Sequence, residues 1–193
     1  MLRRTLSTVC ATLVAGFHAL PVAAVVDPDL PRQADLMVLG IVLDHTESSQ
    51  NAFGLKLVPD DPDAIRPRMA LCNHDKREKL TLDFYERDTA VVISELHVEQ
   101  VTTPHVECVV PPQHIENFDS GKGIHLGMSL QEVTAILGPD FNTHPHPDED
   151  VISYRIDDKD LALLQRHNAP AYYGQYHFRE GVLTKYEMGF EFP

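Results

Sequence analysis

Residues 123–139 read GIHLGMSLQEVTAILGP and contain a short helix whose two ends are both specified by the sequence. Ser129 can cap the first turn, and Glu132 follows three residues later, as a capping box requires. The apolar stripe at helical spacing is formed by Val133, Ile136 and Leu137. Gly138 and Pro139 then end the helix, because glycine adopts the left-handed exit conformation and proline cannot continue a helix. A helix this short has little stability on its own. We therefore expect its apolar stripe to pack on the β-rich sequence that follows.

The run GIHLGMSLQEVTAILGPD resembles the signature of the outer-membrane assembly factor BamE (SmpA/OmlA) and of the related repeats of the β-lactamase inhibitor protein. In that family a helix is followed by antiparallel strands. The inhibitor is a tandem of such units, with helices covering one face of a curved sheet and a protein partner held on the concave face. The resemblance therefore implies a protein-binding role, which the residues of a site must still support.

Alternation of apolar and polar residues predicts three strands in each half of the chain. The six segments are 69–72, 79–86 and 90–101 in the first half and 151–156, 172–178 and 182–192 in the second. Residues 39–54 precede the first set as a degenerate copy of 123–138, with Gly-Ile-x-Leu, a hydroxyl cap, a short helix and a closing glycine. Residues 157–168 could add a further short helix or an edge strand.

These patterns predict an α+β fold made of two tandem helix-plus-antiparallel-strand units, with the helices packed on one face of an antiparallel sheet. An extended lead-in at 25–35 precedes a first unit at 36–110. The proline- and glycine-rich segment 111–121 is expected to be a linker, and the second unit spans 122–193. Whether the two units share one sheet is left open by the sequence.

Residues 1–24 have the features of a secretory signal peptide. Arg3 and Arg4 precede an apolar run from Leu6 to Leu20, and small residues support cleavage after Ala24. The segment before Cys10 has no lipobox, so we expect no lipid anchor, unlike BamE. No later apolar run approaches the roughly 20 residues of a membrane span. We therefore expect a periplasmic or secreted protein.

The chain carries 16 basic and 29 acidic residues, a formal net charge of −13. Such a charge disfavours nucleic acid and anionic lipid as partners and favours a basic protein or cations, although solubility alone would also explain it.

The cysteines that remain after cleavage are Cys72 and Cys108. In an oxidising compartment they are expected to form a structural disulfide.

The candidate partner-binding surface is the outward face of the C-terminal strands, where tyrosine lies among charged residues. Its residues are Tyr173, Gln175 and His177 on one strand and Lys185, Glu187 and Glu191 on the next, with Asp83 and Tyr85 from the first unit. A half-solvated sheet of no special role would show the same pattern.

Residues 143–150 form a proline-rich loop that offers an alternative, a transition-metal site. Its candidate ligands are His144, His146, Asp148 and Asp150. The spacing is unlike that of Cys/His zinc sites, so a solvated loop is favoured over a metal site. We find no nucleophile elbow, no His-Glu-x-x-His helix and no phosphate-binding loop, and we expect neither enzymatic activity nor a cofactor.

We therefore expect a non-enzymatic protein-binding module that acts through an acidic sheet face, either as an envelope assembly or stability factor or as an inhibitor of a basic enzyme. The alternative is a metal-binding envelope protein that uses the His144 and His146 loop. A third possibility is a structural protein that self-associates through an edge strand. The oligomeric state is not determined by the sequence.

Overall fold

The computed structural model describes residues 29–45, 53–87, 90–103 and 107–192. The predicted signal peptide and most of the helix predicted in the first unit lie outside the described residues. Within the described part of the chain, no helix is long and apolar enough to cross a membrane.

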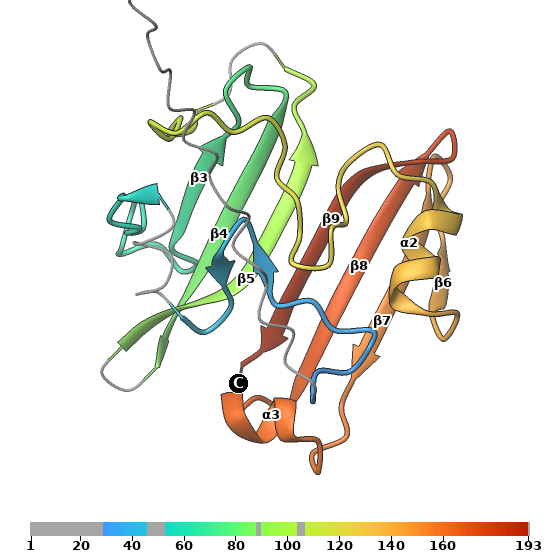
Figure 1. Ribbon diagram of the computed structural model, residues 1–193. Coiled ribbons are helices and arrows are strands. Elements are labelled where there is room, and N and C mark those ends of the chain that lie inside the picture. Colours follow the sequence, from blue (N-terminus) through green and yellow to red (C-terminus); the bar gives the residue numbers. More distant parts are fainter. Residues whose placement is uncertain (1–28, 46–52, 88–89, 104–106, 193) are drawn as a thin grey trace, which may run out of the picture.

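Seven antiparallel strands form one twisted sheet, in the order β3-β4-β5-β9-β8-β7-β6 (Figure 1). The strands are β3 (Arg68–Cys72), β4 (Glu78–Arg87), β5 (Ala90–Gln100), β6 (Asn142–Pro145), β7 (Asp150–Ile156), β8 (Ala171–Arg179) and β9 (Val182–Glu191). The remaining elements are a two-stranded ribbon of β1 (Met37–Val38) and β2 (Ile41–Val42), and the short helices α2 (Leu130–Leu137) and α3 (Ala162–His167). Residues 157–168, for which the sequence allowed either a helix or an edge strand, therefore contain the helix α3.

The two halves of the chain meet where β5 pairs with β9, with Leu96 opposite Met188 and Val98 opposite Tyr186. Since β3 to β5 come from the first half and β6 to β9 from the second, both halves contribute to one continuous sheet. One face of this sheet is lined by apolar side chains on alternate positions, including Leu82, Leu96 and Met188, all of which are buried. The opposite face is polar.

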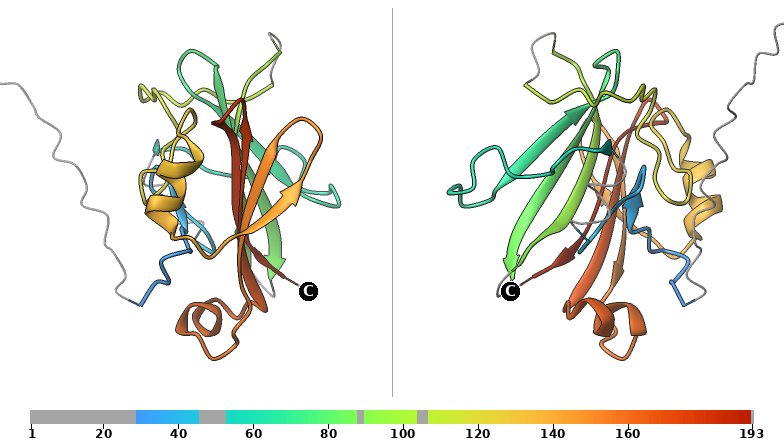
Figure 2. Two further views of the ribbon diagram at one scale, coloured as in Figure 1. Left: turned by 90° about the vertical axis from the view of Figure 1, so that its right-hand side faces the viewer. Right: turned by 60° about the vertical axis from the view of Figure 1, so that its left-hand side comes forward.

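The expected fold class, two helix-plus-strand units with helices packed on one face of a sheet, is wrong. Strands make up 42% of the described chain and helices only 10%, so the sheet dominates the fold. The physical reason is strand length: β4 and β5 have 10 and 11 residues, whereas α2 and α3 have 8 and 6. Most of the layer over the apolar face is irregular chain rather than helix (Figure 2).

The α2 helix begins and ends as its sequence predicts. The Ser129 hydroxyl accepts a hydrogen bond from the Glu132 amide, and the Glu132 carboxylate accepts one from the Ser129 amide, which completes the capping box. Gly138 follows the last turn at φ 97°, a conformation that glycine adopts without strain. Val133 and Leu137 are buried toward the sheet.

Residues 111–121, the expected linker, lie in the layer that covers the apolar face. Phe118 is fully buried there, its amide donates to the Glu78 carboxylate at 2.7 Å, and its carbonyl accepts from the Tyr186 hydroxyl at 2.5 Å. A polypeptide held at both its apolar side chain and its backbone is a packed part of the fold, so this segment is part of the layer that covers the sheet.

Four tyrosines are fully buried between the sheet and the covering layer, and three of their hydroxyls donate hydrogen bonds to backbone carbonyls of that layer. The three bonds run from Tyr172 to Asp35 (2.8 Å), from Tyr186 to Phe118 (2.5 Å) and from Tyr154 to Gly138 (2.6 Å). The fourth hydroxyl, of Tyr176, has no hydrogen-bond partner among the described residues. These bonds satisfy carbonyls that burial removes from water and so fasten the irregular layer to the sheet.

The predicted disulfide between Cys72 and Cys108 is confirmed, with Cα atoms 5.6 Å apart. It connects the end of β3 to the chain that runs beside it. In that chain Val109 donates to the Ala70 carbonyl at 2.8 Å and accepts from the Cys72 amide at 2.9 Å. The two backbone hydrogen bonds and the disulfide together cover part of the β3 edge, which would otherwise present unpaired backbone groups.

Candidate functional site

The polar face of the sheet carries rows of side chains that lie directly opposite one another in register. One row runs from Thr81 through His97, Glu187 and Gln175 to Ser153, and another runs from Arg68 through Asp83, Glu95, Gly189 and Tyr173 to Arg155. In the edge-on view of Figure 2 (left), α2 and the β1–β2 ribbon lie on the other side of the sheet. We call this uncovered surface the polar face.

The polar face is hollowed into an open groove of about 470 Å³. Four of the six predicted partner-binding residues line it, namely Tyr173, Gln175, Glu187 and Glu191. The other two, His177 and Lys185, face each other in the adjoining row of the sheet. His144 also lines the groove, and its Nε2 lies 2.7 Å from the Ser153 hydroxyl.

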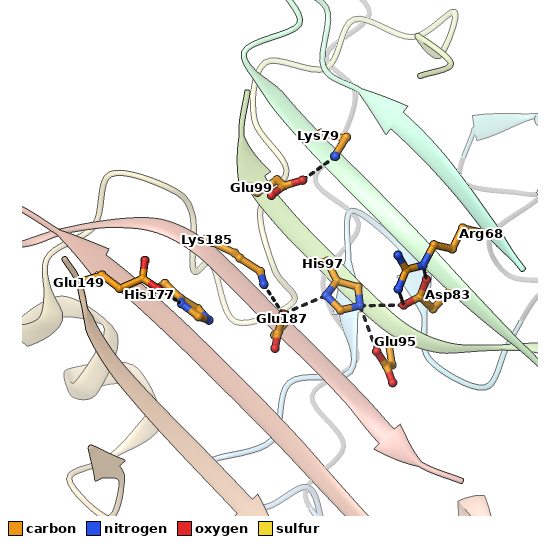
Figure 3. Close-up of polar contacts among 10 residues, drawn as sticks. All are labelled: Arg68, Lys79, Asp83, Glu95, His97, Glu99, Glu149, His177, Lys185 and Glu187. Carbon is orange, nitrogen blue, oxygen red and sulfur yellow. Dashed lines mark hydrogen bonds and ion pairs between the residues drawn. The ribbon is translucent and has the colours of Figure 1, made fainter. Parts of the chain in front are cut away.

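His97 lines the groove and contacts three carboxylates (Figure 3). Its Nδ1 is 3.0 Å from Glu187, and its Nε2 is 3.1 Å from both Asp83 and Glu95. Two features of the strands create this arrangement. Glu95 and His97 are two residues apart on β5 and so share a face, and a β-bulge at Ser94 places Glu95 opposite Asp83.

The carboxylates hold His97 in its charged form. Burial alone would lower the pKa of His97, but the hydrogen bonds with Asp83, Glu187 and Glu95 outweigh it and raise that pKa to about 11. Burial likewise favours neutral Glu187, yet His97 and Lys185 lower the pKa of Glu187 to about 2. With both ring nitrogens donating to carboxylates, His97 has no lone pair for general-base catalysis in this state.

The groove is not uniformly acidic, which corrects the expectation of an acidic sheet face. Its carboxylates are paired with cations (Figure 3): Arg68 binds Asp83, and Lys185 binds Glu187 at 2.7 Å. Farther along, Arg155 contacts Glu191 through two nitrogens. The carboxylates of the groove are therefore offset by neighbouring cations, and the surface presents both positive and negative groups.

The four predicted metal ligands of the 143–150 loop are not brought together. His144 contacts Ser153, whereas His146 lies 3.8 Å from Glu149, and Asp148 and Asp150 are exposed. Glu149 in turn accepts a hydrogen bond from His177 at 3.0 Å. Among the described residues, the group of metal-binding side chains whose ligand atoms lie within 4.8 Å of one another is Asp83, Glu95 and His97.

Sequence reasoning missed the role of Glu95 and His97, and it did not name Arg68 or Arg155. The alternation of Glu95, His97 and Glu99 along β5 was the signal that places these side chains on one face. Their partners could not be identified in this way, because His97 and Glu187 are 90 residues apart in the sequence.

Comparisons with known proteins give no match: no protein-family model, no curated protein and no solved structure is significantly similar to this chain. The function must therefore be argued from the polar face itself.

Proposed function

We propose that this chain is a non-enzymatic protein-binding module of the cell envelope or of the secreted protein fraction, and that the polar face is its contact surface. The observation that carries the proposal is the groove itself, an uncovered hollow lined by charged side chains that are already held by one another. Side chains ordered before binding lose less conformational entropy when a partner arrives, which favours affinity.

The composition of the groove supports a protein as the ligand. Tyr173 and the arginines Arg66, Arg68 and Arg155 are residue types enriched at protein interfaces, and they lie beside acceptors that include Glu191 and Gln175. Alternating charges select a partner of complementary pattern, while the net charge of −13 favours encounter with a basic protein. The disulfide and the signal-like N-terminal segment support an extracytoplasmic location.

The resemblance to BamE and the β-lactamase inhibitor protein adds little to this proposal. Its motif is the run at residues 123–140, and the tandem helix-plus-strand units that it implied are not what the chain forms. We therefore leave two roles, assembly of an envelope complex and inhibition of a basic enzyme, to be separated by the identity of the partner.

The test is a charge swap that keeps an ion pair but reverses it. In the double variant Arg155→Glu with Glu191→Arg, both side chains are about half exposed, so the pair can reform while the groove presents the opposite pattern. Cross-linking of the purified protein in envelope extract, read by mass spectrometry, should yield one dominant partner that the swapped variant loses.

The matched control is the same swap in the pair Asp75 and Arg77, which lies at the β3–β4 turn away from the groove. This variant should retain the partner. The proposal is overturned if no partner is enriched, or if both swapped variants retain it equally.

A further inference from the structure

The three carboxylates around His97 suggest a second property of the groove, independent of any protein partner. We propose that Asp83, Glu95 and His97 form a binding site for a divalent first-row transition metal ion, with the Nε2 atom of His97 and one carboxylate oxygen from each acid as ligands. Imidazole and carboxylate together suit Zn²⁺ and its neighbours, which makes Zn²⁺ the appropriate probe.

The separations of the ligand atoms are compatible with one shared ion. Asp83 Oδ2 and Glu95 Oε2 each lie 3.1 Å from the same ring nitrogen, and all three atoms fall within 4.8 Å of one another. Two ligand atoms about 2.1 Å from a metal and roughly 95° apart are about 3.1 Å from each other. A single N–H, by contrast, can point well at only one of two acceptors.

The surroundings of the three ligands match those of protein metal sites. Glu187 accepts a hydrogen bond from the opposite ring nitrogen at 3.0 Å, and a carboxylate in this position orients a metal-binding histidine. Tyr173 lies across Gly189 from Glu95 on the same face of the sheet. All three ligands lie on the paired strands β4 and β5, and the side chain of Asp83 is only 6% exposed, so the ligands are held by rigid elements.

The charges of the site can accommodate the ion. Asp83, Glu95 and Glu187 supply three negative charges, and His97, Arg68 and Lys185 offset them. An ion that replaces the Nε2 proton raises the local charge by one. The Arg68 side chain is 53% exposed and approaches mainly Asp83 Oδ1, so it can turn toward water and leave Oδ2 to the ion.

The test is calorimetric titration of the purified, disulfide-bonded, chelator-treated protein with Zn²⁺. We expect one saturable site per chain. His97→Gln and Glu95→Gln should each weaken it by about 100-fold or more, and Glu187→Gln by about 10- to 100-fold, because that residue orients the ring. The matched control is the double variant His144→Ala with His146→Ala, which should change the affinity by less than about 2-fold since those residues lie outside the site.

Titration with Co²⁺ gives a second readout, because replacement of water by protein ligands changes its visible absorption, and the His97→Gln variant should lose that change. Circular dichroism of each variant separates loss of ligands from loss of fold. If His97→Gln does not fold, Glu95→Gln and the Co²⁺ spectrum of the unmodified protein decide the matter. The proposal is overturned if the unmodified protein shows no saturable uptake, or if uptake is unchanged by both substitutions.

Discussion

Tyr173 and Glu95 meet across Gly189, which lies opposite both of them in the sheet. Burial and the negative charge of the nearby Glu95 raise the pKa of Tyr173. A Cβ atom on Gly189 would lie 2.7 Å from the Glu95 Cγ and 2.9 Å from the Ser94 carbonyl oxygen. The glycine therefore leaves room for Glu95 and Tyr173, both of which line the groove.

Gly189→Ala should destabilise the protein by about 1–3 kcal/mol, since the added methyl group overlaps a backbone atom that cannot move aside easily. Urea denaturation measures the change. Adding Glu95→Ala should recover part of the loss, because it removes one of the two clashing groups. Equal stability of Gly189→Ala and the unmodified protein would show that the close approach is not real.

The buried tyrosine hydroxyls allow a paired comparison. Tyr186→Phe removes the donor to the Phe118 carbonyl and leaves that buried oxygen without its hydrogen bond, so we expect a loss of about 1–3 kcal/mol in the free energy of unfolding. Tyr176→Phe removes a buried hydroxyl that has no partner among the described residues and should be neutral or stabilising. Thermal and urea unfolding of both variants check this, and a larger loss for Tyr176→Phe contradicts it.

Loss of the disulfide should weaken the fold substantially. Cys72 and Cys108 are separated by 36 positions, and closing a loop of that length contributes about 4 kcal/mol in the chain-entropy model. The variant with both cysteines replaced by alanine should therefore unfold at lower urea concentration than the oxidised protein. Reduced unmodified protein serves as the control and should behave like the variant, and coincident curves for all three forms would refute the effect.

His97 should make stability depend on alkaline pH. Its pKa rises from 6.5 in the unfolded chain to about 11 in the fold, so its contribution is complete below pH 6.5. Between these two values the unfolded chain loses the proton first, and the contribution falls by at most about 1.4 kcal/mol per pH unit. In chelator, the stability difference between the unmodified protein and His97→Gln should shrink from pH 7 to pH 10. A constant difference would argue against a buried imidazolium.

Glu187 should act at the opposite end of the pH scale. Its pKa falls from 4.5 to about 2 in the fold, so its contribution is present above pH 4.5 and is lost as the pH falls toward 2. Acid unfolding of Glu187→Gln, compared with the unmodified protein, should therefore differ most near neutral pH and least near pH 2. A difference that persists at pH 2 would contradict this assignment.

Much of the candidate site followed from alternation alone. Tyr173, Gln175 and Glu187 were expected on the outward face because side chains in a strand alternate with a period of two, and the groove contains all three. The face was expected to be acidic, but its carboxylates are paired with Arg68, Lys185 and His97. Counts of acidic and basic residues do not show such pairing. The tandem-unit fold failed for a related reason: a well-capped helix of eight residues says little about what covers the rest of the sheet.

By itself, the sequence determined the features that depend on near neighbours: the capped helix after Ser129, the alternating faces of the strands and the two cysteines able to pair. Capping and alternation act over a few residues, so their outcome can be read locally. Only the tertiary structure decided that β5 pairs with β9, which brings His97 to Glu187 across 90 positions of the sequence. That register results from the whole chain burying its apolar face at once, and no local pattern contains it.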